Sequence, residues 1–508
     1  MPRMIKWAGW LFILFVWILG VGAREAALAG TEPVPVEFQP IRELIQKRLV
    51  ETGTPSLAVA VARDGQIVWE EAFGWADREN RVPAHEHTMY SLASISKPFT
   101  ATALMILVER GQVDLDKPIN EYLGDSPLTV HVGRAEEVTV RRVADHTSGL
   151  PTYYHFFYED EPYRRPPMAD TIRRFGHIVY APGERYEYSN LGYGILEHLI
   201  AKVSGKSYED FMRQEVFIPL GLTHTSVGID PGLEKYAAVR YGDDQKPIPF
   251  YDFDHRGGSA VYSSAHDLVR FGLFHLKNHR PDQKTILPDA AIDRMQQPAE
   301  GRSYAIGWDI RKSGEYKFVN HGGGMGGVRT TLDFEPAQNI AVVVLANSST
   351  GLVDEIRKTI FHVLFPEEKK ETAEPPQPQK PEEKLFPDPA LLGKWEGLVH
   401  TPDEQIPLTL EFQADGDAHA QLAGQLKTLL NEVSWKDGFL QGLMMGDVRM
   451  EDITRRPFLL RLTLKKRGDA LNGALTSMSQ PEGRVGNALS CWVELKKQGA
   501  AAGEKNIQ

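Results

Sequence analysis

The feature that most constrains the fold of this 508-residue chain is a segment rich in proline and charge, residues 366–387. It runs through Pro-Glu-Glu-Lys-Lys and Glu-Pro-Pro-Gln-Pro-Gln-Lys-Pro, and its first large apolar residue is Leu385. Such a segment cannot bury enough apolar surface to fold, so it behaves as an extended linker. We therefore predict two folded parts, residues 30–365 and 388–497, followed by a disordered tail at 498–508.

The N-terminal part has strand patterns at both ends and a long helical and looped middle. Apolar runs predict two strand pairs, at 57–69 and 328–346, and the first pair turns at Asp64-Gly65, a strong hairpin signal. Helical spacing predicts helices at 40–51 and 352–365. We expect an α/β fold in which an antiparallel sheet is flanked by helices, with an inserted α-rich lobe.

The C-terminal part has a different pattern, with short alternating runs separated by glycine and aspartate turns. The runs cover residues 408–412, 421–426, 458–464 and 488–495. This pattern predicts a small all-β domain, either a sandwich or a barrel. Cys491 is the only cysteine, so no intrachain disulfide is possible, and its place in the last run predicts a buried, inert thiol.

The first residues have the features of a secretory signal peptide. Arg3 and Lys6 precede an apolar run at 7–23, and small residues around Ala29 offer a cleavage site. We expect cleavage to remove residues 1–29. The alternative is an uncleaved membrane anchor, because the run is near the lower limit for spanning a bilayer. In either case the chain is predicted to be exported, to the periplasm or the extracellular space.

A serine and a lysine lie three residues apart where a strongly apolar helix is expected to begin. The stretch reads Ser94-Ile-Ser-Lys97, and residues 101–108 are almost all apolar, which is typical of a helix buried on all sides. Spacing of three places both side chains on one helical face. Positive charge nearby and burial both disfavour a charged ammonium, so Lys97 can act as a base for the Ser94 hydroxyl.

A second candidate stretch, Tyr188-Ser-Asn190, precedes a helix expected to start near residue 191. The Tyr188 phenol is a candidate proton carrier, but its ordinary pKa near 10 requires a cationic neighbour before it acts as a base. Lys97 is a candidate for that neighbour. The Asn190 amide offers both a donor and an acceptor, to position either a substrate amide or Lys97.

A third stretch, His321-Gly-Gly-Gly324, lies directly before the strand predicted at residue 328. Glycines let a backbone approach a ligand closely and leave its N–H groups exposed, so Gly323 and Gly324 are candidate substrate-binding residues together with His321. Acyl transfer needs two N–H donors aimed at a developing oxyanion. The N–H groups of Ser94 and Gly324 are our candidates.

In this order, S-x-x-K, Y-x-N and H-x-G resemble the motifs of the class C β-lactamase and serine D,D-peptidase superfamily, which also contains esterases and D-aminopeptidases. The resemblance covers roughly residues 38 to 365. Other stretches fit the same family: Pro55–Val61, Asp145–Pro151, Pro219–Leu222, Gly257-Gly258 and Ser263–Phe271.

The resemblance implies a mechanism as well as a fold. Ser94 would attack a carbonyl, Lys97 and Tyr188 would shuttle its proton, and an acyl-enzyme would form and be released by water or another acceptor. No metal and no organic cofactor is implied. Asp145 and His146 could suggest a triad with Ser94, but we assign them to a loop turn, because Lys97 and Tyr188 already supply the base.

The sequence departs from the lactamase pattern in the third motif, where the lactamases carry lysine and this chain has His321. A histidine is largely neutral at pH 7, so recognition of anionic β-lactams and peptide C-termini should be weaker. Arg329 could replace the missing charge if its side chain faces the cleft. The pattern favours the esterase and D-aminopeptidase branches.

An aromatic stretch, Tyr153–Tyr158, follows the Asp145–Pro151 segment and allows two interpretations. In the family this region borders the cleft, so the stretch could form an aromatic rim for an apolar acyl or aryl group. It could equally be a packed loop.

Taken together, the sequence predicts an exported serine hydrolase that acts on a small-molecule ester, amide or peptide. The alternatives are a D,D-carboxypeptidase, a D-aminopeptidase or a weak β-lactamase acting on cell-wall fragments, or a penicillin-recognising receptor that acylates slowly. The net charge of −11 argues against a nucleic-acid partner, since a phosphate backbone requires a basic face.

Overall fold

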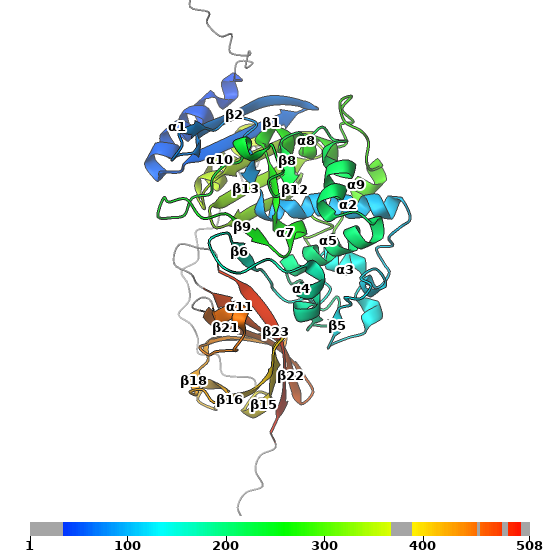
Figure 1. The fold of residues 1–508 in the computed structure, drawn as a ribbon, viewed down its shortest axis with the longest axis vertical. Helices are drawn as coiled ribbons and strands as arrows, with labels where there is room; N and C mark the ends of the chain where they lie inside the picture. The colour runs from blue at the N-terminus through cyan, green and yellow to red at the C-terminus, as the bar shows by residue number, and fades with distance from the viewer. Residues whose placement is uncertain (1–33, 367–388, 455–457, 480–485, 499–508) are drawn as a thin grey trace, which may run out of the picture.

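The computed structural model describes residues 34–366, 389–454, 458–479 and 486–498, and its larger part is built on a seven-stranded sheet (Figure 1). Neighbouring strands are antiparallel in the order β11-β12-β13-β14-β1-β2-β3. This confirms the predicted fold class. The strands are β1 (Ser56–Arg63), β2 (Gln66–Asp77), β3 (Val82–Pro83), β11 (Asp309–Ser313), β12 (Tyr316–Met325), β13 (Val328–Glu335) and β14 (Ile340–Ala346).

The predicted hairpin joins β1 and β2. Asp64 and Gly65 have φ of 51° and 79°, so both turn residues are in the left-handed region that a type I′ turn requires. On its other side β1 pairs with β14, from Leu57 opposite Ala346 to Arg63 opposite Ile340. The two strand pairs predicted from opposite ends of this part of the chain are therefore neighbours in one sheet.

Side-chain alternation along β1 gives the sheet two buried faces. Leu57 and Val59 pack with helices α1 (Gln39–Thr52) and α10 (Leu352–Leu364), which cover one face. Ala58 and Ala60 point to the other face, where α8 (Ala265–His275) and the helical lobe pack. Burying one such Val or Leu stabilises the fold by about 1.5–3 kcal/mol.

The helical lobe is centred on α2 (Ser96–Glu109), whose residues from 96 to 107 are all buried. Gly111, just beyond its end, has φ of 68°, as expected for a helix-stopping glycine. Further helices are α3 (Val140–Ala144), α4 (Met168–Phe175), α5 (Asn190–Ser204), α6 (Tyr208–Met212), α7 (Arg256–Ser259) and α9 (Asp289–Met295). Short strands pair as β4 (Tyr90–Ser91) and β8 (Thr225–Val227) on either side of β10 (Val261–Ser263), β5 (Thr129–Val130) with β7 (His177–Ile178), and β6 (Phe156–Tyr158) with β9 (Tyr251–Phe253).

The C-terminal part is a nine-stranded antiparallel sheet in the order β18-β17-β16-β15-β23-β22-β21-β20-β19. Its two end strands are separated only by Leu430 in sequence, so the sheet curls until its edges nearly meet around a core that includes Trp395 and Leu462. Cys491 is buried in this core. The elements are β15 (Gly393–His400), β16 (Gln405–Phe412), β17 (Ala418–Leu422), β18 (Thr428–Leu429), β19 (Asn431–Lys436), β20 (Phe439–Met444), α11 (Glu451–Thr454), β21 (Phe458–Arg467), β22 (Ala470–Ser479) and β23 (Ala488–Lys497).

The C-terminal sheet docks against the helical lobe through the start of β23 (Figure 1). Tyr154 and Ala488 exchange two backbone hydrogen bonds of 2.9 and 2.8 Å, and the Ser490 hydroxyl donates to the Thr152 carbonyl at 2.7 Å. Trp492 stacks on His131 with ring centroids 4.6 Å apart. Backbone pairing combined with ring stacking makes the two parts one continuous packed structure.

The aromatic stretch at 153–158 belongs to this docking region. Tyr153 and Phe156 are buried, and the Phe156 N–H donates to the Asn487 side chain at 2.9 Å. The Tyr153 hydroxyl donates to Asp254 at 2.5 Å. Of the two interpretations left open by the sequence, the structure favours the packed loop.

Several sequence predictions fall outside the described residues. They concern the signal peptide at 1–29, all but the first residue of the linker at 366–387, and nearly all of the tail at 498–508. Over the described ranges, no helix has the length and apolar character needed to cross a membrane.

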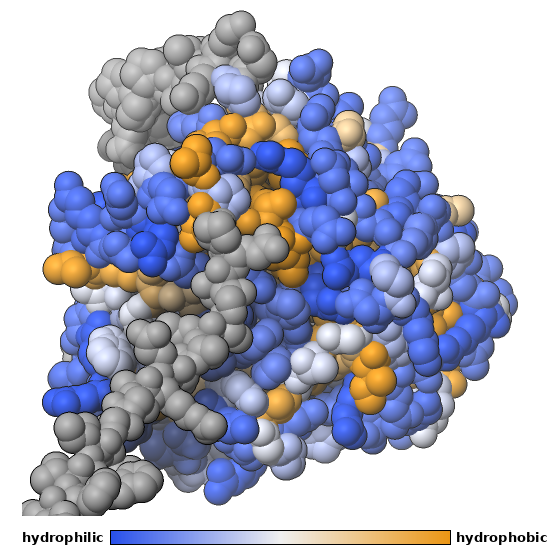
Figure 2. Space-filling view, turned by 90° about the horizontal axis from the view of Figure 1, so that it is seen from above, coloured by the Kyte–Doolittle hydropathy of each residue, from blue (hydrophilic) through white to orange (hydrophobic). Residues whose placement is uncertain are grey.

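Figure 2 shows the end of the molecule where α1 lies, which is largely hydrophilic with a cluster of hydrophobic side chains. On α1 itself Val50 is exposed, and single exposed apolar residues need no partner to explain them.

Candidate active site

Ser94 lies on a single 3₁₀ turn, Ala93–Ile95, directly before α2. Its neighbour Ala93 has φ of 49°, a left-handed conformation that costs a residue with a Cβ about 1–2 kcal/mol. The surroundings hold the turn in place: the Leu92 N–H donates to the Val261 carbonyl at 2.9 Å, and the Thr330 hydroxyl donates to the Leu92 carbonyl at 3.0 Å. The fold thus fixes Ser94 at the wall of a cavity, half-buried.

Gly323 allows β12 to pass close to this turn. A Cβ at Gly323 would lie 2.1 Å from the Leu92 carbonyl oxygen and 2.3 Å from the Thr330 hydroxyl. These contacts are far inside van der Waals distance, so only glycine fits here without moving the turn.

We expect Gly323→Ala to lower kcat/KM by about 100-fold or more, because displacing the Ser94 turn by about 1 Å is enough for a loss of that size. Hydrolysis kinetics on purified protein, with a small ester or amide of the kind expected from the sequence, measure the effect. Gly351→Ala is the matched control, since a Cβ there meets nothing within 4 Å. Wild-type kinetics in Gly323→Ala would contradict this role for the glycine.

The Lys97 side chain is fully buried and its amine reaches Ser94. Nζ donates to the Asn190 Oδ1 at 2.6 Å and to the Gly258 carbonyl at 3.0 Å, and it lies 3.3 Å from the Ser94 Oγ. All three partner groups are neutral. Burial therefore holds the pKa of Lys97 well below its ordinary range.

The Tyr188 ring lies 4.7 Å from the Lys97 Nζ, measured to the ring centroid. Burial nevertheless raises the pKa of the Tyr188 phenol, and its hydrogen bonding with Ser94 lowers it by less. The phenol is therefore protonated at neutral pH. This geometry suits a group that donates and passes on a proton better than one that starts as a base.

Asn190, the first residue of α5, uses both ends of its amide within the protein. Its Oδ1 accepts from Lys97, and its Nδ2 donates to the Tyr153 carbonyl at 3.1 Å. Of the two partners considered from the sequence, the structure pairs Asn190 with Lys97. Contact with a substrate amide remains a prediction.

His321 lies on β12 and lines the same cavity as Ser94, which has a volume of about 500 Å³. Its Nδ1 is 2.8 Å from the Gly322 carbonyl and must carry the proton, so Nε2 accepts from the Tyr304 hydroxyl at 3.0 Å. Burial, and then the neighbouring Lys97, lower the pKa of His321 to about 3. The imidazole is therefore neutral at physiological pH. This agrees with the expectation from the sequence that position 321 lacks the positive charge of the lactamase lysine.

The three glycines after His321 have different surroundings. Gly322 lines the cavity, Gly323 packs on the Ser94 turn, and Gly324 is opposite Arg329 in the β12–β13 ladder. The assignment of the Gly324 N–H to an oxyanion hole stays a prediction.

Arg329 is turned away from the cavity. Its guanidinium pairs with Asp354 on α10 at 2.8 Å, on the sheet face opposite the one where Thr330 contacts the Ser94 turn. Neighbouring residues on a strand point to opposite faces, so Arg329 cannot supply the charge missing at His321.

Sequence reasoning missed an aromatic cluster around the site. The Tyr304 ring is 4.7 Å from the His146 ring, which is 4.3 Å from the Tyr188 ring. His146 Nδ1 accepts from the Ser189 N–H at 3.2 Å, while Asp145 accepts from Thr147 within its own loop. His146 therefore supports the Tyr188 segment, and no motif spacing could have connected it to Tyr304.

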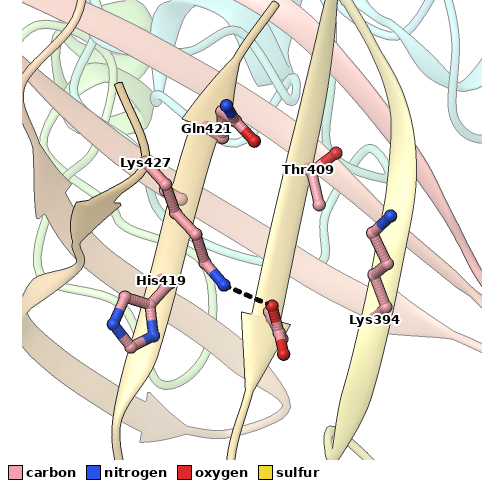
Figure 3. A pocket seen from close by; sticks show the side chains of 7 residues that line it. Lys394, Thr409, His419, Gln421 and Lys427 are labelled. Atoms are coloured by element: carbon pink, nitrogen blue, oxygen red, sulfur yellow. Dashed lines mark hydrogen bonds and ion pairs between the residues drawn. The ribbon is translucent and has the colours of Figure 1, made fainter. Parts of the chain in front are cut away.

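A separate hollow of about 190 Å³ lies on the outer surface of the C-terminal sheet (Figure 3). Its side chains, including Lys394 and His419, alternate with the buried residues of β15 to β17. Lys427 pairs there with Glu411 at 2.5 Å. This hollow is polar and faces solvent, and it lies apart from the cavity that contains Ser94.

Comparison with known proteins agrees with the fold and with the family that the sequence resembles. The sequence model of the family described as Beta-lactamase matches residues 41–365. Penicillin-binding protein 4* of Bacillus subtilis (strain 168) is 26% identical over 415 residues, covering 76% of this chain and 88% of that protein. Protein flp of Staphylococcus aureus (strain MRSA252) is 24% identical over 328 residues, or 63% of this chain and 64% of flp.

Solved structures share the fold at low identity. The octameric penicillin-binding protein homologue from Pyrococcus abyssi has a TM-score of 0.57 at 22% identity, covering 89% of this chain and 99% of that one. SurE has a TM-score of 0.63 at 21% identity, covering 91% and 99%. A class C β-lactamase has a TM-score of 0.55 at 19% identity and covers 67% of this chain and 97% of its own.

Proposed function

The chain belongs to the β-lactamase family of serine hydrolases, and on that premise we propose that it cleaves a small ester or amide through an acyl-enzyme on Ser94. The observation that carries the proposal is the Lys97 amine, fully buried, without a carboxylate among its hydrogen-bond partners in the described structure, and 3.3 Å from the Ser94 Oγ. A buried neutral amine in contact with a hydroxyl is a standard arrangement for an activated nucleophile.

The proposed acylation moves one proton and exchanges one bond. The Ser94 Oγ attacks the substrate carbonyl carbon while Lys97 takes the hydroxyl proton, and the N–H groups of Ser94 and Gly324 stabilise the oxyanion. The tetrahedral intermediate then collapses, the bond to the leaving group breaks, and Tyr188 delivers a proton to that group and regains one from the Lys97 ammonium, so that the Ser94 proton is the one transferred overall. Water attacks the acyl-enzyme by the same steps in reverse and restores Ser94.

The electrostatics of the cavity favour an ester or amide without a carboxylate near the scissile bond. The family resemblance would place a cation at residue 321, but the His321 imidazole is neutral here. Arg329 is paired with Asp354 on the far face of the sheet. Both observations argue against a D,D-carboxypeptidase or an efficient β-lactamase.

A direct comparison of substrates tests the proposal. Mature protein is incubated with a chromogenic short-chain ester and with a chromogenic cephalosporin, beside a Ser94→Ala variant. We expect ester turnover that falls to background in Ser94→Ala. Turnover of the cephalosporin alone would favour the lactamase or peptidase alternative, and stoichiometric labelling without turnover would favour a slowly acylating receptor.

We also propose that the chain is exported. Support comes from the basic start, the apolar run at 7–23 and the small residues ending at Ala29. Mass analysis of the mature protein should find an N-terminus at Gly30. A mature chain that retains residues 1–29 and stays with the membrane would indicate an uncleaved anchor instead.

A further inference from the structure

The active-site cavity contains one acidic side chain that the proposed chemistry does not use. Among the described residues that line it, Asp309 is the only one with a carboxyl side chain; the others include serine, tyrosine, asparagine and the neutral His321. Asp309 is partly exposed and shares the cavity with Ser94. A carboxylate in the wall of a substrate cavity attracts positively charged substrate groups and repels negatively charged ones.

The strand pairing fixes Asp309 at this position and leaves its carboxylate available. It is the first residue of β11 and lies opposite Asn320 of β12, the residue before His321. The Asn320 amide donates to the Asp309 backbone carbonyl at 3.1 Å, not to the carboxylate. In the described parts of the chain the carboxylate forms no ion pair, and Arg311, two residues along the strand, lies over the Phe318 ring at 4.2 Å.

The negative charge of this carboxylate acts on another residue of the cavity wall. After burial, the negative charge of Asp309 is the next largest cause that raises the pKa of Tyr186, another lining residue. Asp309 is thus close enough to act on a group inside the cavity.

Three basic side chains near the cavity are neutral or already paired, so they do not reverse this preference. The Lys97 amine donates to Asn190 and Gly258. In the neighbouring hollow across Tyr304, Arg141 pairs with Asp116 at 2.7 Å and Arg294 pairs with Glu109.

We propose that Asp309 forms a subsite for a positively charged amine on the substrate, so that the preferred substrates are esters, amides or peptides of amino acids with a free amino group. The subsite rests on the proposed function, because it concerns the same cavity and the acyl-enzyme on Ser94. An ammonium placed near the scissile carbonyl would hydrogen-bond to the carboxylate, whereas an acylated or anionic analogue would leave it unpaired or repelled.

The test compares three alanine p-nitroanilides, used in both enantiomers, that differ only at the amine: free, N-acetylated and N-succinylated. For wild-type protein we expect kcat/KM to be highest with the free amine. In Asp309→Asn the ratio of free-amine to N-acetyl kcat/KM should fall about 10- to 100-fold, the range of a hydrogen bond to a charged group. Asp309→Glu should keep the preference, and Asp309→Lys should reverse it towards the N-succinyl substrate.

Asp243→Asn, at an exposed turn, is the control and should leave the ratio unchanged. An unchanged ratio in Asp309→Asn, or a wild-type preference for the N-succinyl compound, would overturn the subsite while leaving the serine hydrolase assignment intact. Failure of wild-type protein to hydrolyse all three anilides and the short-chain ester would overturn the proposed function, and the subsite with it.

Discussion

Lys97→Met is expected to lower kcat/KM for ester hydrolysis by about three to four orders of magnitude. The Ser94 hydroxyl would lose the only amine within hydrogen-bond distance of it in the described structure, at 3.3 Å, and general-base catalysis by a positioned group accounts for an effect of this size. Methionine has a similar length and no proton-accepting nitrogen. Steady-state kinetics on folded protein, checked by circular dichroism, measure the loss.

Lys202→Met provides the matched control, since this exposed lysine on α5 lies on the surface and pairs with Asp125 at 3.3 Å. It should retain wild-type kinetics. If Lys97→Met kept more than about a tenth of wild-type kcat/KM, far above the loss expected for a missing general base, Lys97 would not be that base.

The lowered pKa of Lys97 also predicts two pH effects. Acylation needs the neutral amine, so kcat/KM should rise with pH through this lowered pKa and reach its plateau below the ordinary lysine range.

The second effect is on stability. Between the lowered pKa of the folded protein and the ordinary lysine pKa of the unfolded chain, the unfolded chain binds a proton on Lys97 that the folded protein does not. The contribution of Lys97 to stability therefore falls as the pH decreases through this range. Urea unfolding at several pH values should therefore show Lys97→Met gaining stability relative to wild type as the pH is lowered.

The second large effect is expected at the contact between the C-terminal sheet and the helical lobe, from Trp492→Ala. Trp492 is 4% exposed and packs with Val179, Tyr180 and Phe439, as well as stacking on His131. Removing a buried tryptophan costs about 3–5 kcal/mol. We expect a loss of stability in that range, measured by denaturant unfolding.

The same substitution is expected to lower kcat about tenfold, because the contact supports the segment that leads to Tyr188. Tyr180 begins this segment, and the Arg185 guanidinium lies over the rings of Tyr180 and Phe439 at 5.0 and 4.4 Å. Deleting residues 389–508 should have a larger effect, since it also removes the partner strand of Thr152 and Tyr154. Leu426→Ala, at a side chain of the same C-terminal part that is 86% exposed, is the control for Trp492→Ala. Full activity in the deletion variant would show that the C-terminal sheet does not support the site.

The parts of this molecule that could be predicted from sequence are those encoded by local spacing. Ser94 and Lys97 meet because they are three residues apart at the start of a helix, and Asp64-Gly65 specifies its own hairpin. The sequence predicts the strand at 340–346 with both ends correct, because a short continuous run of β-branched and apolar residues bounded by turns is typical of a buried strand.

The parts that could not be predicted depend on which surfaces the fold brings together. Asp309 reaches the cavity because β11 and β12 are neighbours, and Tyr304 lies beside it through an isolated bridge to Asp309. No local pattern distinguishes these two residues from other tyrosines and aspartates. The aromatic stretch at 153–158 is a docking segment only because a strand more than three hundred residues later pairs with it. The direction of Arg329 depends on its register in β13, which a single residue's shift would reverse.

The most direct measurement of the central claim is to identify the residue that becomes acylated. Protein is mixed with a slowly deacylating chromogenic ester, quenched in acid, and analysed by intact mass and by peptide mass spectrometry. The account predicts one acyl group per chain, on the peptide containing Ser94, and none in Ser94→Ala. An acyl group on another residue, or continued turnover in Ser94→Ala, would contradict it.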